Sequence, residues 1–123
     1  MGILLVAIGG AIGATTRYLA SIWAASRFGA DFPYGTLIVN IVGCFIIGLF
    51  MTIATERIIL NPYWRLFITV GFVGGLTTFS SFSYETLHLL QTANMMGAFY
   101  NIGLNLVVGF FATWLGIVAA RII

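Results

Sequence analysis

Apolar residues dominate four long stretches of this chain, approximately Gly2–Ala25, Gly35–Ala54, Tyr63–Leu90 and Gly97–Ile122. A helix of about 20 apolar residues crosses the hydrocarbon core of a bilayer, so each stretch is long enough to span a membrane. Polar residues gather in the short segments between the stretches, at Phe28–Tyr34, Thr55–Pro62 and Gln91–Met96. The pattern predicts an all-α membrane protein with four transmembrane helices in a single domain, residues 1–123.

The third stretch is too long for one simple crossing. A continuous helix over Tyr63–Leu90 would reach about 42 Å, against a hydrocarbon core of about 30 Å. Its middle, Gly71–Ser83, holds glycines followed by a run of threonines, serines and phenylalanines. We therefore expect the third transmembrane helix to be broken, with two half-helices joined by unwound backbone. Such backbone is tolerated at membrane depth only where protein or a water-filled cavity surrounds it.

The amino-acid composition indicates that lipid is the main solvent. Hydrophobic residues make up 61% of the chain, charged residues only 7%, and lysine is absent. A water-facing surface needs more polar groups than this, so a soluble domain is excluded. The net charge of +2 comes from scattered arginines, which leaves no basic patch for nucleic acid.

The arginines give almost no preference for one direction of insertion. On the side of the N-terminus we expect Arg57, Arg65 and Arg121. On the opposite side we expect Arg27 and Arg17. Because arginines and lysines in short loops set orientation, the chain could insert either way, which would permit an antiparallel dimer; one fixed topology stays equally open. Four helices enclose little volume, so we expect any polar pathway to lie between subunits. Gly9 and Gly13, four residues apart, predict a close helix contact.

Two of the expected helices carry polar and small residues at helical spacing. On one face of the second stretch lie Thr36, Asn40, Gly43 and Cys44. Along the fourth stretch a similar stripe recurs every four residues, at Asn101, Asn105, Gly109 and Thr113. Amide and hydroxyl groups donate hydrogen bonds, so two facing stripes would line a track of neutral donors across the bilayer. The alternative is that these residues only bond neighbouring helices to one another.

The charges near this track favour an anion. A cation or proton pathway usually carries a buried carboxylate, and the one candidate is Glu85, at the end of the Gly71–Ser83 run. Arg17 lies within the first span, where it either reaches the membrane surface or attracts anions at a vestibule. His88 has no second metal ligand at a suitable spacing, and no catalytic Ser-His-Asp or Cys-His set is present. Neither a metal site there nor an enzyme is expected.

The expected break offers two further binding chemistries. Unwound backbone frees carbonyl oxygens, which suit a hard cation such as Na⁺. Phe79 and Phe82 stand three residues apart in the same segment, and the positive edge of an aromatic ring can face a small anion. The alternative is that both phenylalanines only pack against other helices or face lipid.

Three motifs resemble those of the CrcB/Fluc family of fluoride channels. The run Gly71-Phe-Val-Gly-Gly-Leu-Thr-Thr-Phe-Ser-Ser-Phe-Ser83, followed by Glu85 and Thr86, resembles the central motif of that family. Gly35-Thr-Leu-Ile-Val-Asn40 resembles its second-helix motif, and Gly9-Gly-x-x-Gly13 with Arg17 resembles its first helix. The likeness covers the chain in length, order and spacing, and the central run is its most specific part.

The resemblance implies a multi-pass channel of the bacterial inner (plasma) membrane that lets fluoride leave the cytoplasm passively and so reduces its toxicity. It also implies an antiparallel, dual-topology homodimer with two pores and a structural Na⁺ at the dimer interface. Matched by motif, the backbone carbonyls of Gly74 and Thr77 would hold that Na⁺. Along the fluoride path we expect Asn40, Phe79, Phe82, Thr36, Ser81, Asn105 and Arg17, with Glu85 near it.

The chain departs from the family pattern at three places. Ser81 stands where threonine is common, which keeps a hydroxyl and loses a methyl group. Asn101 and Asn105 stand where relatives carry tyrosine, serine or histidine. The polar stripe of the fourth helix is preserved, but the roles of these two asparagines stay open.

Two other functions are weighed against a fluoride channel. A small proton-coupled multidrug exporter also has four helices and about this length, but it needs a membrane-embedded glutamate in the first helix, where this chain has only Arg17. A small assembly subunit of a membrane complex would predict no ion flux from the purified chain.

Overall fold

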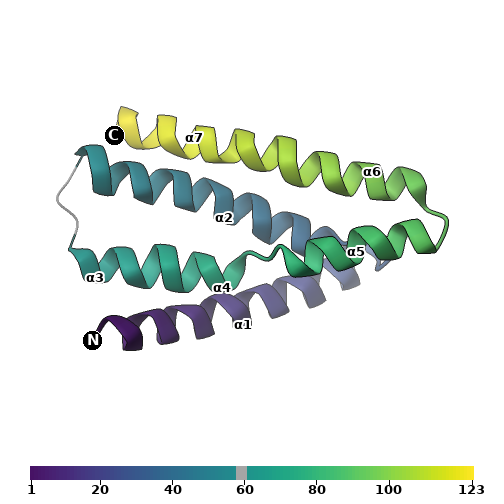
Figure 1. Ribbon diagram of the computed structural model, residues 1–123, viewed down its shortest axis with the longest axis horizontal. Coiled ribbons are helices and arrows are strands. Elements are labelled where there is room, and N and C mark those ends of the chain that lie inside the picture. The colour runs from purple at the N-terminus through teal and green to yellow at the C-terminus, as the bar shows by residue number, and fades with distance from the viewer. Residues whose placement is uncertain (58–60) are drawn as a thin grey trace.

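The computed structural model describes residues 1–57 and 61–123 (Figure 1). These residues form helices joined by short connections, with no strand among them. The elements in chain order are α1 (Gly2–Phe28), α2 (Tyr34–Thr52), η1 (Ile53–Arg57), α3 (Pro62–Arg65), η2 (Leu66–Val73), α4 (Gly74–Leu76), α5 (Ser80–Gln91), α6 (Met95–Gly103), η3 (Leu104–Val108) and α7 (Gly109–Ile122). The labels η1 to η3 mark π-helical segments, which wind more widely than an α-helix.

Four segments of the described chain are long and apolar enough to cross a membrane, namely Gly2–Phe28, Tyr34–Glu56, Pro62–Gln91 and Met95–Ile122. They confirm the four predicted stretches and extend each of them slightly. The third and fourth begin where asparagines cap them, because the side-chain oxygens of Asn61 and Asn94 accept the N–H groups of Tyr63 and Gly97. The segments run up and down in one bundle, with both chain termini at the same end (Figure 1).

The first span packs closely against the first half of the third, where α1 contacts η2 and α4. A Cβ atom added to Gly9 would stand 2.5 Å from the carbonyl oxygen of Phe67. A Cβ atom on Gly75 would stand equally close, 2.5 Å, to the carbonyl oxygen of Gly10. Only glycine allows backbones to approach this closely. The predicted small-residue contact of the first helix is therefore confirmed, and its partner is the third span.

The second and fourth spans form the other close pair, between α2 and α7. A Cβ atom on Gly48 would collide with the backbone carbonyl of Thr113, and one on Gly116 would collide with that of Phe45. This contact holds the polar faces of the two helices in a fixed register. Gly109 lies opposite Cys44, and a Cβ atom added to Gly109 would stand 3.5 Å from Sγ of Cys44.

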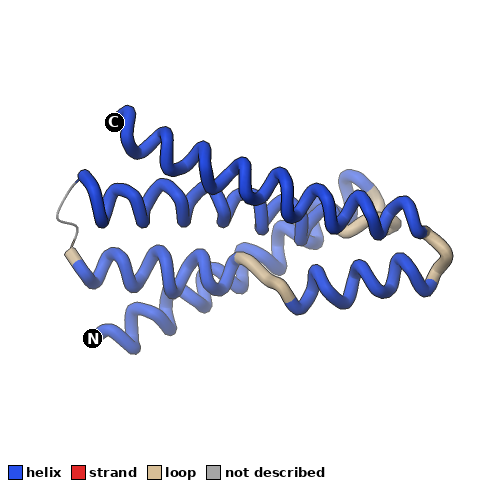
Figure 2. The backbone as a smooth tube through the Cα atoms, turned by 45° about the horizontal axis from the view of Figure 1, so that its top comes forward, coloured by secondary structure: helices blue, strands red, loops and turns tan. Residues whose placement is uncertain are grey.

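The helix of the third span is interrupted at Thr77–Phe79. Helix α4 ends at Leu76 and α5 begins at Ser80, and a short loop joins the two (Figure 2). Thr77 has an extended backbone, with φ −87° and ψ 158°, and its methyl group lies where a Cβ atom on Gly43 would be. The Thr78 hydroxyl oxygen accepts the Ser81 N–H at 3.1 Å, which satisfies one of the free donors at the start of α5. The remainder of the Gly71–Ser83 run is helical.

Large apolar side chains cover the outside of the bundle. Phe79 is 77% exposed, Phe110 73% and Val107 69%, whereas the most completely buried apolar residues are alanines such as Ala24 and Ala120. In water such a surface would be unstable, so lipid or another protein chain must cover it.

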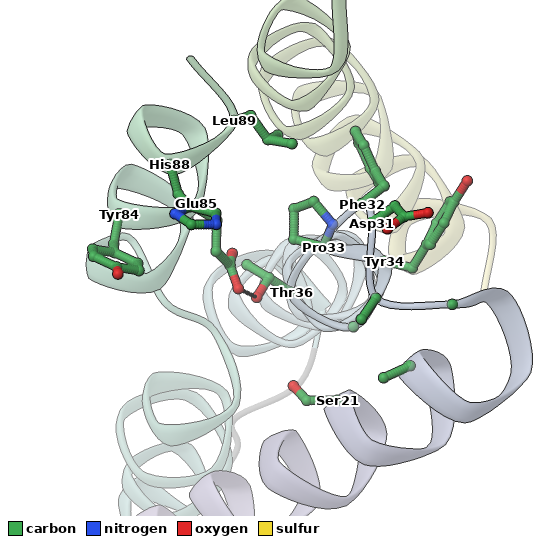
Figure 3. Close-up of a pocket in the computed structure, with 14 residues that line it drawn as sticks. Ser21, Asp31, Phe32, Pro33, Tyr34, Thr36, Tyr84, Glu85, His88 and Leu89 are labelled. Atoms are coloured by element: carbon green, nitrogen blue, oxygen red, sulfur yellow. Dashed lines mark hydrogen bonds between the residues drawn. The ribbon is translucent and has the colours of Figure 1, made fainter. Parts of the chain in front are cut away.

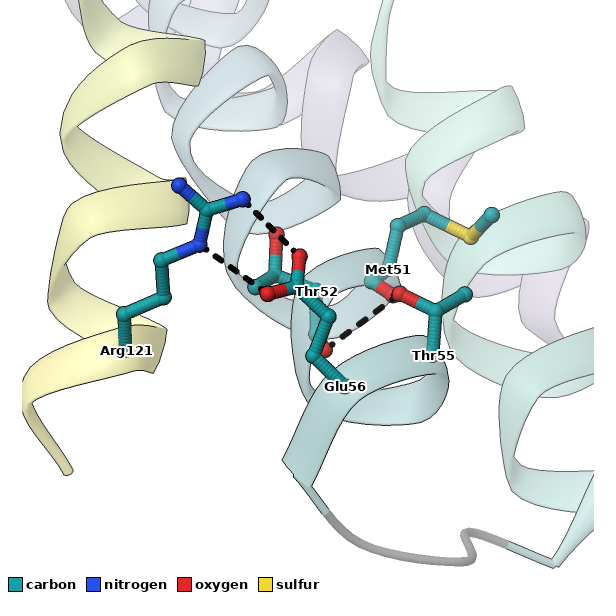
Figure 4. A network of polar contacts seen from close by, with 5 residues as sticks. All are labelled: Met51, Thr52, Thr55, Glu56 and Arg121. Atoms are coloured by element: carbon teal, nitrogen blue, oxygen red, sulfur yellow. Dashed lines mark hydrogen bonds and ion pairs between the residues drawn. The ribbon is translucent and has the colours of Figure 1, made fainter.

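At the end of the bundle that holds the termini, the second and fourth spans are joined by an ion pair (Figure 4). Arg121 donates from Nε and Nη2 to the two carboxylate oxygens of Glu56, at 3.1 and 3.0 Å. Both side chains are largely exposed, so the pair is screened by solvent and stabilises the fold little.

Candidate ion pathway

The side-chain amide of Asn40, on α2, binds both backbone groups of Thr78, in the middle of the Thr77–Phe79 connection. Its Oδ1 accepts the Thr78 N–H at 2.9 Å, and its Nδ2 donates to the Thr78 carbonyl at 3.1 Å. The amide thus replaces the backbone partners that Thr78 loses by leaving the helix. The same Nδ2 also donates to Oδ1 of Asn105, at 3.0 Å, so the two polar stripes meet at this pair of residues.

The hydrogen-bonded chain continues from Asn105 into the interior of the protein. Asn105 Nδ2 donates to the backbone carbonyl of Asn101 at 2.8 Å and to its Oδ1 at 3.0 Å. Asn101 is fully buried, with 0% of its surface exposed, and its Nδ2 donates to the Thr86 hydroxyl oxygen at 2.9 Å. That hydroxyl donates in turn to the carbonyl of Phe82 at 2.7 Å. A continuous polar chain therefore links α2, the fourth span and α5.

An open groove of about 480 Å³ borders this chain on the surface of the bundle. Its lining includes Asn40, Asn105, Phe79 and Phe82, together with both Gly74 and Thr77. The rings of Phe79 and Phe82 lie 5.6 Å apart between centroids and are tilted by 57°. Among the described residues that line the groove there is no carboxylate. The groove is thus lined by neutral amides and aromatic rings.

A second cavity of about 220 Å³ is lined by residues of α1, α2, α5 and the connection between α1 and α2 (Figure 3). Within it, the buried hydroxyl of Thr36 donates to Oε2 of Glu85 at 2.9 Å. The other carboxylate oxygen, Oε1, is buried and has no hydrogen-bond partner among the described residues. His88 and Asp31 also line this cavity. The carboxylate therefore lies in a different cavity from the amide groove.

Arg17 points to the end of α4. Its side chain is partly buried, and Nε donates to the backbone carbonyl of Gly75 at 3.1 Å. A cation is favourable there because the last carbonyls of a helix are unpaired and carry partial negative charge. The guanidinium therefore supports the Thr77–Phe79 connection from the side of α1.

The two carbonyls predicted to hold Na⁺ differ from those already bound by side chains. Arg17 binds the carbonyl of Gly75 and Asn40 binds that of Thr78. Gly74 and Thr77 instead line the open groove, and a Cβ atom added to Gly74 would meet nothing within 4 Å. This face of the connection is therefore open toward the outside of the bundle.

The structure divides the predicted path residues among three places. The groove collects Asn40, Phe79, Phe82 and Asn105, whereas Thr36 lines the second cavity. Ser81, on the first turn of α5, and Arg17 line neither. Sequence reasoning missed that Thr86 joins the polar chain and that Arg17 binds Gly75. No spacing along the chain signals either contact, because both partners come from different spans.

The fold and the groove define a small multi-span α-helical membrane protein with a neutral, donor-bearing polar chain beside a surface groove. Residues 4–117 match the profile of the family described as CrcB-like protein, Camphor Resistance (CrcB). The chain is 48% identical to a fluoride-specific ion channel FluC of Sulfurihydrogenibium sp. (strain YO3AOP1), covering 98% of this chain and 97% of the relative. It is 46% identical to proteins of the same name from Acidobacterium capsulatum, over 98% of this chain and 97% of the relative, and Roseiflexus sp. (strain RS-1), over 100% and 99%. The chain therefore belongs to the CrcB-like family.

Proposed function

We propose that this protein is a fluoride-specific ion channel, which lets fluoride leave the cytoplasm passively and reduces its toxicity. The relatives that bear this name match nearly the whole chain. Within the structure, the observation that carries the proposal is the groove in which the amides of Asn40 and Asn105 lie beside the rings of Phe79 and Phe82. The protein is a transport protein and not an enzyme.

The chemistry of this groove suits a small anion. A dehydrated anion needs hydrogen-bond donors, and each asparagine amide carries two N–H groups. Aromatic rings add positive edges without presenting a competing charge. A carboxylate in the groove would repel the ion, and the described lining has none. These features favour fluoride flow over the flow of a cation, for which buried acidic groups are the usual device.

A second copy of the chain, in antiparallel orientation, completes the pathway in this proposal. The groove is open on the surface and Phe79 is 77% exposed, so one subunit alone does not enclose an ion. The nearly balanced arginines support insertion in both directions, which yields a dual-topology homodimer. We place this dimer in the bacterial inner membrane, with the groove of each copy covered by its partner.

We further propose that a structural Na⁺ lies on the dimer axis, held by the carbonyls of Gly74 and Thr77 from both copies. The fit of the residues supports it, because these two positions line the open groove beside the end of a helix, where a cation is favoured. The ion would tie the two copies together at the Thr77–Phe79 connection. Replacing Na⁺ by K⁺ is expected to lower both the thermal midpoint and the dimer fraction. Unchanged values of both would contradict the assignment.

The experiment that tests the channel is ion efflux from liposomes that contain only the purified protein. We expect rapid fluoride efflux and far slower chloride efflux; equal rates, or none, would refute the proposal. Phe79→Ala should reduce fluoride efflux strongly. Phe111→Ala is a matched control, because Phe111 is exposed on α7 but does not line the groove.

The alternative of a proton-coupled multidrug exporter is not favoured. That class needs a carboxylate within the first span, and α1 contains no acidic residue. Efflux of fluoride without a coupled proton gradient would separate the two functions.

A further inference from the structure

Backbone groups at the two ends of the polar chain determine which way the amides of its three buried or half-buried asparagines face in this structure. At one end, the Thr78 N–H can only donate, so the oxygen of Asn40 must face it. The Nδ2 of Asn40 then points to the Thr78 carbonyl and to Asn105. The group of Asn105 that faces Asn40 is therefore its oxygen.

The other end of the chain is determined by a second backbone group. The Thr86 hydroxyl donates to the carbonyl of Phe82, so its oxygen can only accept from Asn101. The Nδ2 of Asn101 thus faces Thr86, and its Oδ1 faces Asn105. Both ends agree on one direction, in which every amide donates toward Thr86.

This direction has a consequence for an ion in the groove. Both N–H groups of Asn40 are already occupied, one by the Thr78 carbonyl and one by Asn105. Asn105 presents its oxygen to Asn40, while its own N–H groups point inward to Asn101. An anion that approaches Asn40 would meet occupied donors and a carbonyl dipole of the wrong sign. In this arrangement, therefore, Asn40 has no free N–H group to offer an anion.

We propose that fluoride reverses the direction of this chain, and that Asn101 is the positioning residue that allows the reversal. The inference rests on the proposed function. The Thr86 hydroxyl rotates from the Phe82 carbonyl to Oδ1 of Asn101, the Asn101 amide turns to donate to Oδ1 of Asn105, and Asn105 turns its N–H groups toward Asn40. The amides of Asn40 and Asn105 then separate and donate to one anion between them. Only hydrogen bonds change, and no proton leaves its heavy atom.

Each backbone carbonyl that loses a side-chain donor in the reversed chain keeps a backbone donor. The Phe82 carbonyl keeps its helical N–H partner within α5. The Asn101 carbonyl, which loses Asn105, keeps the backbone N–H of Leu104. Without an anion the reversed chain lacks three of the seven hydrogen bonds of this network, and two N–H contacts to the anion replace two of the three. An anion that binds only the reversed arrangement therefore shifts the equilibrium toward it.

Asn101 is essential to this scheme because it is fully buried and has no water to replace a partner. An amide carries both a donor and an acceptor, so it can serve the chain in either direction. Leucine at this position would serve neither direction. The oxygen of a turned Asn105 would then face an apolar group, which disfavours the anion-binding arrangement.

The first test is NMR of the channel reconstituted with ¹⁵N-labelled asparagine. On addition of fluoride, the side-chain NH₂ signals of Asn40 and Asn105 should both acquire a coupling to ¹⁹F, and that of Asn101 should shift without such coupling. Asn61 and Asn94 cap helices and take no part in the polar chain, so their side-chain signals serve as internal controls that should not shift. Coupling to Asn40 alone, or an unmoved Asn101 signal, would overturn the proposal.

The second test measures fluoride efflux from liposomes. Asn101→Leu should reduce efflux about tenfold and raise the fluoride concentration at which efflux saturates. Asn94→Ala, which removes a cap far from the groove, should leave both unchanged. Efflux of Asn101→Leu within twofold of the wild-type rate would overturn the proposal while leaving the channel assignment intact. Absence of fluoride efflux from the wild-type protein would instead refute the channel assignment itself. The NMR test uses the wild-type protein, so its result does not depend on whether a variant folds.

Discussion

Replacing Asn40 by alanine would remove the side chain that holds the Thr77–Phe79 connection in place. The amide makes two hydrogen bonds to one residue, accepting the Thr78 N–H at 2.9 Å and donating to its carbonyl at 3.1 Å. Neither backbone group has a helical partner, because Thr78 lies outside α4 and α5. In Asn40→Ala both groups would lose their partner at once.

The size of the effect follows from this count of lost partners. An unsatisfied backbone group in a buried position costs about 1–3 kcal/mol. The groove lets some water reach the connection, so the lower part of that range applies to each of the two groups. We therefore expect Asn40→Ala to lower the free energy of unfolding by about 2–4 kcal/mol. Removing an ordinary helix cap, as in Asn94→Ala, should cost only about 1 kcal/mol.

Unfolding can be followed in detergent by the fluorescence of the three tryptophans. The two variants and the wild-type chain would be compared in the same denaturant series, with fluoride efflux measured in parallel. A loss for Asn40→Ala no larger than that for Asn94→Ala would show that the connection holds its shape without the amide. The reasoning from backbone partners would then be wrong, even if efflux were also lost.

Three further outcomes are expected in the same unfolding assay. Gly9→Ala should lower the free energy of unfolding by about 1–3 kcal/mol, because the added methyl would stand 2.5 Å from a carbonyl oxygen of the third span. Gly103→Ala, with open space around the added methyl, should be neutral or stabilising. Equal effects of the two would contradict the close contact. Arg17→Met should cost about 1.5–3 kcal/mol, since it removes a charged donor from the end of α4; an unchanged unfolding midpoint would show that this contact is not formed. Arg121→Gln should leave the midpoint unchanged because its ion pair with Glu56 is exposed, and a clear drop that is insensitive to salt would argue against this.

The number and limits of the membrane spans follow from the sequence because they depend on composition alone. A run of apolar residues inserts into lipid whatever its neighbours are, so the four stretches could be read directly and are found within a few residues of their predicted ends. The polar stripes could also be predicted from the sequence, because helical spacing puts Asn101 and Asn105 on one face. In the structure the stripes meet where Asn40 contacts Asn105.

The length of the third span predicted a departure from regular helix but not its position. The whole Gly71–Ser83 run was a candidate, whereas the structure places the non-helical residues at Thr77–Phe79. Glycines at Gly71 and Gly75 serve instead to let α1 approach, which is a requirement of the neighbouring helix. Where a helix stops depends on which side chains of other spans can replace its lost hydrogen bonds, and here Asn40 and Arg17 do so.

Only the tertiary structure decided the direction of the polar chain. Every asparagine side chain has a donor and an acceptor, so the sequence is compatible with either direction. The choice is made at the two ends of the chain. The Thr78 N–H meets Asn40 only when the second and third spans pack together. The Phe82 carbonyl accepts the Thr86 hydroxyl within α5, and that hydroxyl meets Asn101 only when the fourth span packs against α5. The residue types in the groove are thus a property of the sequence, whereas the oxygen that Asn105 turns toward Asn40 is a property of the fold.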